Sequence, residues 1–280
     1  MAQWIIAHEP WVRASFFVGV LALMALWELL APRRRLTVGR RTRWISHLAI
    51  SALNTALVRL LLPLTAVAMA LFAERHGWGL LNHYTVAGPL ALALGVIALD
   101  LVIYLQHVMF HAVPAFWRLH RVHHADLDFD VTTGVRFHPI EILLSMAIKL
   151  AAIAALGPPA LAVLVFEVLL NATSMFSHGN VHLPGAIDRV LRRLVVMPDM
   201  HRVHHSVIPH ETNSNFGFNL PWWDRLFGTY RDQPQAGHEG MTIGLDNLRA
   251  PRQVTRLSGI LALPFHGRSG DYTINRDRRR

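Results

Sequence analysis

Histidines at regular spacing are the feature of this chain that points most directly to chemistry. Ten of its 18 histidines fall into four clusters, in the order pair, triplet, pair, triplet. Both triplets belong to the same pentapeptide, His-Arg-Val-His-His, at 120–124 and 201–205. Helix packing gives no reason to repeat a pair and a triplet in this order. We therefore predict ten metal ligands: His107, His111, His120, His123, His124, His178, His182, His201, His204 and His205.

The spacing within each cluster suits shared coordination. Residues three or four apart lie on one face of a helix, roughly 5–6 Å apart, so two imidazoles can bind one ion or two neighbouring ions. Imidazole binds iron, zinc, copper and nickel alike, so these ligands do not identify the metal. The chain has no cysteine, which excludes disulfides, thiolate-bound zinc and iron–sulfur clusters carried by the chain itself.

Two stripes of polar residues at helical spacing lead along hydrophobic segments to the paired histidines. One stripe begins at Asp100 and the other at Glu167. These acids are candidate acceptors for the second ring nitrogen of the ligands, although a polar contact between packed helices explains them equally well. We expect other stripe residues to line a substrate pocket above the metals: Tyr104, Asn171 and Ser174.

The composition indicates that a membrane positions these histidines. Hydrophobic residues make up 52% of the chain and charged residues 16%, against about 25% charged in ordinary soluble domains. Apolar runs at 12–31, 47–73 and 86–110 are long enough to span a bilayer, and Gly157, Pro158 and Pro159 divide 140–176 into a shorter hairpin. We predict an all-α integral membrane bundle of four to five hydrophobic helices with a cytoplasmic, histidine-rich helical cap.

The arginines give this bundle a predicted orientation. Basic residues cluster after the first apolar run, which puts 32–46, 111–139 and 177–280 in the cytoplasm and the loop 74–85 outside. Topology and lipid headgroups thus account for the formal charge of +9, and no nucleic-acid partner is predicted. Within one structural domain we expect N-terminal anchor helices over 1–85, a catalytic region over 86–232 and a basic C-terminal tail over 233–280.

At these residues the sequence resembles the fatty acid hydroxylase and sterol desaturase superfamily of membrane di-iron enzymes. The resemblance runs from about Asp100 to Tyr230. Besides the histidine clusters, it rests on Arg136-Phe-His-Pro-Ile-Glu141, Pro198-Asp-Met-His201, Asn213-Ser-Asn-Phe-Gly217 and Trp223-Asp-Arg-Leu-Phe-Gly-Thr229. Val108 departs from the pattern, because relatives often have Arg after the first histidine. That departure removes no ligand but leaves the subgroup open.

The resemblance implies two iron ions on the ten histidines, with zinc as a possible substitute, and O2 as co-substrate. It implies hydroxylation or desaturation of a lipid acyl or alkyl chain, or of a sterol-like substrate, in a bacterial inner membrane. The resemblance implies an auxiliary role for His138, and we also expect auxiliary roles for Asp100, Glu167, Asn180, Asn215 and Asp224. The chain has no glycine-rich dinucleotide motif, no cysteine cluster and no separate haem domain, so electrons must come from a separate reductase, ferredoxin or cytochrome.

Two other classes of protein use buried histidines. A zinc-dependent membrane hydrolase would activate water with the same cluster, but it needs fewer than ten ligands. A metal transporter needs polar residues that continue to the far side of the membrane. Metal analysis and dependence on O2 separate these classes from an oxygenase.

Overall fold

The computed structural model describes residues 1–84, 86–267 and 272–274, and these residues form helices without a β-strand. Five stretches are long and apolar enough to cross a membrane, which confirms the predicted helical membrane bundle. They are α2 (Glu9–Leu30), the segment Arg40–His83, α6 (Gly88–Ala112), α8 (Pro139–Leu156) and α9 (Ala160–Ser177).

Proline and glycine set the boundaries of these helices. The run predicted as one span at 47–73 forms two helices, α3 (Arg40–Leu61) and α4 (Ala66–Arg75), because the chain breaks at Pro63. Thr65 then begins α4, since its side chain accepts a hydrogen bond from the backbone N–H of Ala68. Between α8 and α9, Gly157 takes a left-handed φ of 63° that lets the chain turn back.

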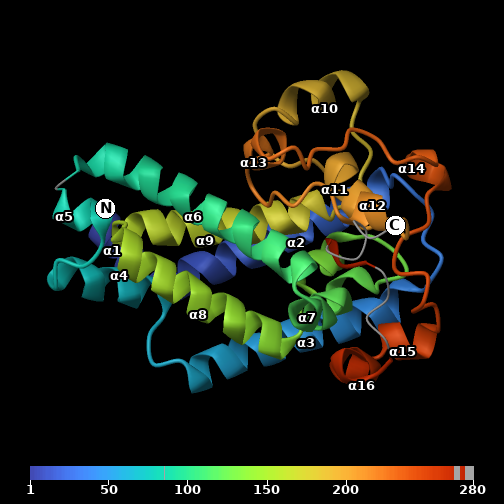
Figure 1. Ribbon diagram of the computed structural model, residues 1–280, viewed down its shortest axis with the longest axis horizontal. Helices are drawn as coiled ribbons and strands as arrows, with labels where there is room; N and C mark the ends of the chain where they lie inside the picture. Colours follow the sequence, from blue (N-terminus) through green and yellow to red (C-terminus); the bar gives the residue numbers. More distant parts are fainter. Residues whose placement is uncertain (85, 268–271, 275–280) are drawn as a thin grey trace.

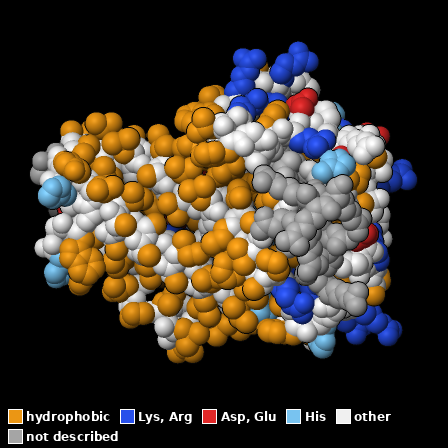
Figure 2. All heavy atoms as spheres, viewed as in Figure 1, with side chains coloured by type: hydrophobic (Ala, Val, Ile, Leu, Met, Phe, Trp, Pro, Cys, Tyr) orange, Lys and Arg blue, Asp and Glu red, His pale blue; other side chains and the backbone are white. Residues whose placement is uncertain are grey.

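The helices that end near the histidines gather at one end of the bundle. In Figure 1 the long helices run side by side, and α7 (Pro114–His124) and α11 (Pro198–His204) lie at the right-hand end. The remaining short elements are α1 (Ala2–Ala7), α5 (Leu80–His83), η1 (Val131–Val135), α10 (Gly185–Leu191), α12 (Pro209–Thr212), α13 (Trp222–Leu226), α14 (Gly237–Gly240), α15 (Pro251–Thr255), α16 (Leu257–Ala262) and η2 (Leu263–Phe265). Figure 2 shows hydrophobic side chains over the bundle, with Lys and Arg gathered around the end that carries the short helices.

The segment expected as a C-terminal tail packs into this cap. Leu245, Val254 and Ile260 belong to one buried core with Trp117 of α7 and Ile50 of α3. The carbonyl oxygens of Leu263 and His266 also accept hydrogen bonds from Arg121. Residues after 240 therefore cover the back of the helix that carries the first histidine triplet.

A buried ion-pair network joins the arginine-rich segment to the cap. Arg43 donates two hydrogen bonds to Asp126, at 2.8 and 2.7 Å, and a third to Asp130 at 2.5 Å. Burial alone would raise the pKa of Asp126, but the Arg43 guanidinium holds that pKa well below its usual range. Arg43 is thus a structural residue and not the headgroup contact expected of this arginine run.

Candidate metal centre

Nine of the ten predicted ligands form two buried clusters, in each of which one ring nitrogen per residue lies within 4.8 Å of the others. The first cluster comprises His107, His111, His120, His124 and His204. The second cluster comprises His123, His178, His201 and His205. Three helices supply the first cluster, α6, α7 and α11, whereas the second combines α7, α11 and the end of α9.

The two identical pentapeptides contribute to the clusters in opposite ways. In the first, His120 and His124 enter the first cluster and His123 enters the second. In the second, His201 and His205 enter the second cluster and His204 enters the first. A helix turns about 100° per residue, so positions i+3 and i+4 lie on the same side of the helix as i but about 100° from each other, on either side of it. The repeated spacing on α7 and at α11 therefore supplies histidines to both sites.

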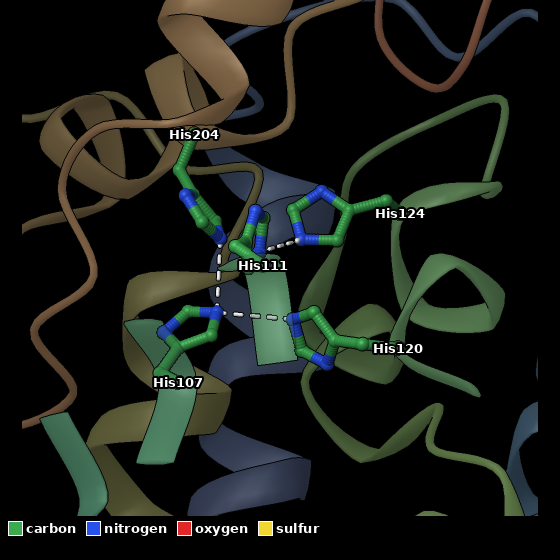
Figure 3. Close-up of side chains that lie close together, drawn as sticks. All are labelled: His107, His111, His120, His124 and His204. Carbon is green, nitrogen blue, oxygen red and sulfur yellow. Dashed lines mark hydrogen bonds between the residues drawn. The ribbon is translucent and has the colours of Figure 1, made fainter. Parts of the chain in front are cut away.

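The ring nitrogens of the first cluster face one another (Figure 3). Nε2 of His107 lies 3.0 Å from Nε2 of His120 and 3.0 Å from Nε2 of His204. Nε2 of His111 lies 3.1 Å from Nε2 of His124. In the second cluster, Nε2 of His178 is 3.0 to 3.2 Å from Nε2 of His123, His201 and His205.

The opposite ring nitrogens show that these facing atoms carry lone pairs. The Nδ1–H groups of His107 and His204 donate to the carbonyl oxygens of Phe216 (2.8 Å) and Ser214 (2.6 Å). A neutral imidazole has one N–H, so with Nδ1–H committed to a carbonyl the two Nε2 atoms meet as bare acceptors. Acceptors this close repel unless a cation lies between them. Two nitrogens bound to one metal at a right angle, each at about 2.1 Å, would be separated by about 3.0 Å, so the spacing fits a shared metal ion.

Some of the ligands lie outside the membrane helices, and burial keeps these ligands in the neutral form that binds metal. It lowers the pKa of His120 and of His178 to about 3 and holds the pKa of His123 and His205 well below the usual value. The imidazoles are therefore neutral at physiological pH, as coordination requires.

Glu141 and Asn213 hold two rings of the first cluster, and the sequence analysis did not assign either a role. Glu141 Oε1 lies 2.6 Å from His120 Nδ1, and Asn213 Oδ1 accepts from His111 Nδ1 at 3.1 Å. The amide nitrogen of Asn213 donates to the carbonyl of Tyr272, which turns its oxygen toward the ring. Such partners fix the tautomer and orientation of a ligand. Both residues lie in motifs of the family resemblance, which was the available signal.

Three predicted auxiliary residues act on a loop and not on the rings. Asp100 accepts hydrogen bonds from Asn219 and Trp223, and Asp224 accepts from the backbone N–H groups of Phe216 and Gly217. Asn215 has a left-handed φ of 53°, and its side chain bonds to the backbone of residues 200 and 231. These contacts fix the segment whose carbonyls orient His107 and His204.

Four other predicted site residues lie away from both clusters. Helix α9 ends at Ser177, so the helical stripe does not continue to His182, which is exposed at the surface. Glu167 pairs with Lys149 (2.7 Å) and Arg13 (3.1 Å). The imidazole of His138 caps α8 and contacts the carbonyl of Leu261, while Asn180 bonds to the backbone of Arg34.

A cavity of about 810 Å³ opens between the membrane helices and ends at the first cluster. His107 and His120 are the clustered histidines among its lining residues, together with Glu141. Its long wall is formed mainly by apolar side chains of α2, α3, α6, α8 and α9. Asn171 and Ser174 line it as predicted, whereas Tyr104 points to the loop after α13, where its hydroxyl bonds to Thr229 and its ring stacks on Phe227.

The comparison with known families agrees with this geometry. Residues 92–229, which hold all nine clustered histidines, match the family model described as fatty acid hydroxylase. This part of the chain belongs to the fatty acid hydroxylase family. The predicted superfamily is thereby confirmed, and the four motifs that carried the resemblance lie within the matched residues.

The curated relatives of this chain carry the names of lipid oxygenases. An ornithine lipid hydroxylase of Rhizobium tropici is 26% identical over 238 residues, which are 81% of this chain and 69% of the relative. An alkylglycerol monooxygenase of Xenopus tropicalis is 29% identical over 149 residues, 53% of this chain and 32% of the relative. Methylsterol monooxygenase 2-2 of Arabidopsis thaliana is 26% identical over 130 residues, 46% of this chain and 48% of the relative. No solved structure matches the chain.

Proposed function

We propose that the protein is a membrane oxygenase that uses two iron ions, one in each cluster, and O2 to hydroxylate a lipid bound in the cavity. The observation that carries the proposal is the position of the first cluster at the end of a largely apolar cavity of about 810 Å³. Pockets of about 300–1,000 Å³ are typical of small-molecule sites, and this one lies among membrane helices, where lipid is the available ligand.

The histidines of the two clusters would hold the ions, and bound iron would supply the oxygen-activating chemistry. The chain's own share is positioning and exclusion of water. The ring of Phe137 stacks on His123 at 4.4 Å between centroids, and Phe129 packs against His178 at 5.3 Å. Phe216 packs on His107, His111 and His204. These rings shield the nitrogens, so the lipid cavity is the route that leads to the first cluster.

The relatives set the order in which lipids should be tested. An ornithine lipid comes first, because the relative with that name covers the largest share of this chain among those compared. Alkylglycerols and methylsterols follow, as the names of the other relatives indicate. We propose hydroxylation over desaturation because these relatives are named hydroxylases or monooxygenases.

A separate electron-transfer protein completes the proposed reaction. We propose that the cap lies on the cytoplasmic face of a bacterial inner membrane. The basic side chains around the cap would then be on the side where reductases and ferredoxins are found. A positively charged face also suits an acidic carrier.

The proposal is tested by lipid mass spectrometry of cells that express the wild-type protein or the His204→Ala variant. We expect one lipid class to gain a single oxygen atom only in the wild-type cells. Metal analysis of the purified protein should find iron. Zinc, together with an O2-independent change such as loss of an acyl chain, would favour the hydrolase and contradict the proposal.

A further inference from the structure

Several buried oxygen atoms of residues on the cavity wall accept no hydrogen bond from the described part of the chain, and three of these atoms also have no ion pair there. They are Oδ1 of Asn54, Oε1 of Gln106 and Oε2 of Glu141, and all three residues line the cavity. Asn54 and Glu141 are only 6% and 4% exposed. A buried acceptor without a donor is costly, especially among membrane helices. Three such atoms, from α3, α6 and α8, indicate a ligand that donates hydrogen bonds.

Gln106 and Glu141 both line the cavity beside histidines of the first cluster, Gln106 next to His107 in the sequence and Glu141 in contact with His120. Gln106 directly precedes His107 in the sequence, and its amide nitrogen donates to the hydroxyl of Ser145 at 2.9 Å. Ser145 lies one helical turn beyond Glu141, so the two α8 residues share a face. The other carboxyl oxygen of Glu141 contacts His120 at 2.6 Å.

Asn54 lines the same cavity from α3. Its amide nitrogen donates to the carbonyl oxygen of Phe137 at 2.9 Å, which fixes the side chain so that Oδ1 is the free acceptor. The ring of Phe137 in turn stacks on His123, with centroids 4.4 Å apart, and lies 6.3 Å from the ring of His120. The three oxygens therefore belong to the wall of the cavity that also includes His107 and His120 of the first cluster.

We propose that these oxygens form a subsite for a primary ammonium group of the lipid substrate. A primary ammonium has three N–H donors and no acceptor, which matches three acceptors, one of them on a carboxyl group. A hydroxyl offers one donor and a quaternary ammonium none. The inference rests on the proposed function and narrows its substrate to lipids that carry an amine, with that amine held beside the first cluster.

Three other charged groups of the cavity pair with one another. Lys149 and Arg13 both pair with Glu167, at 2.7 and 3.1 Å. Lys149 lies eight residues beyond Glu141 on α8, which is about 12 Å along the helix. The wall between the helices is mostly apolar and suits the chain of the lipid.

The subsite is tested by equilibrium binding of two probes to the purified, metal-loaded protein in detergent micelles. One probe is N-palmitoyl ornithine with a free side-chain amine, and the other is the same molecule with that amine acetylated. We expect the free amine to bind at least roughly tenfold more tightly, because acetylation removes the charge and two donors. Equal affinities would overturn the proposal.

Single substitutions test which residues cause the preference for the free amine. Gln106→Met removes an acceptor and should lower the preference for the free amine several-fold, whereas Gln106→Glu keeps an acceptor and should preserve it. Asn54→Leu should act like Gln106→Met, and metal content shows whether it folds. Thr55→Val is the matched control, since Thr55 lines the cavity but its hydroxyl donates to the carbonyl of Ser51 at 3.0 Å. An unchanged preference in Gln106→Met would also overturn the subsite.

This failure is distinguishable from failure of the proposed function. Oxygen incorporation into a lipid without an amine, with equal binding of both probes, would overturn the ammonium subsite and leave the oxygenase proposal standing. A clear preference for the free amine, with no oxygenated lipid in cells or with purified protein, would support the subsite and contradict the oxygenase proposal.

Discussion

The two histidine clusters differ in their surroundings although the same pentapeptide builds both. In the first cluster, four of five rings have an Nδ1 partner: Phe216, Asn213, Glu141 or Ser214. In the second, His178 bonds to the Ser174 carbonyl, but Nδ1 of His123 and His205 has no partner in the described residues. The first cluster also borders the cavity. The cluster that borders the cavity is thus the more firmly oriented one.

The largest effect should come from removing one ligand from each cluster. We expect His204→Ala and His123→Ala each to lower bound metal and to reduce turnover by more than about 100-fold, beyond the loss typical of a residue that only supports a ligand. His182→Ala is the matched control, because His182 is exposed and outside both clusters. Metal analysis and product formation measure the result. Full activity of either ligand variant would contradict a catalytic role of the cluster that the replaced histidine belongs to.

A smaller effect should follow when the orientation of the first cluster is weakened. Glu141→Gln keeps the size of the side chain that contacts His120, and we expect about 10- to 100-fold weaker metal binding at the first cluster alone. His138→Ala serves as the control, since its ring contacts the carbonyl of Leu261 and no clustered histidine. Metal titration followed by spectroscopy of each site reports the affinities. Equal weakening of both clusters would contradict their separate support.

A substitution in the cavity wall should alter the product without loss of either metal ion. Ala172 lines the cavity, and Ala172→Phe should shift the oxidised carbon or slow turnover while metal content stays normal. Tyr104→Trp alters a residue of the polar stripe that begins at Asp100, and Tyr104 is outside the cavity lining, so the products of this variant should match those of the wild type. Tandem mass spectrometry of the product identifies the oxidised carbon and shows whether the lipid lies beside Ala172 or beside Tyr104. The reverse pattern would mean that lipid approaches along the Tyr104 side.

The smallest effect concerns the order of metal loss. Because two rings of the second cluster lack an Nδ1 partner in the described residues, we expect a chelator to remove the metal of the second cluster before that of the first. A time course of metal content in the wild type should then show two phases, and Glu141→Gln should bring them together. A single phase in the wild type would mean that the different surroundings do not affect metal retention.

Local spacing accounts for what the sequence predicted well. The pentapeptides placed six clustered histidines on short helices, and hydropathy located the five membrane stretches. The errors arose where long-range packing decides. His182 follows His178 at helical spacing, but α9 ends at Ser177 and the side chain turns to the surface.

Partners distant in sequence were equally hidden. Glu141 and His120 meet because α7 and α8 pack together, and no periodicity encodes that contact. Arg43 looked like part of a headgroup-facing run until its buried contacts with Asp126 and Asp130 were seen. Likewise, the segment after 240 lacks a strong apolar pattern, yet its scattered Leu245, Val254 and Ile260 complete the core beside Trp117.

The central claim is that metals held by the two clusters use O2 to oxidise a lipid in the adjoining cavity. The most direct measurement is mass spectrometry of the lipid product formed by purified, iron-loaded protein with an external electron donor under ¹⁸O2. The account predicts one ¹⁸O atom in the product, no product without O2, and none from His123→Ala or His204→Ala. Oxygen derived from water, or a product formed equally well without O2, would contradict it.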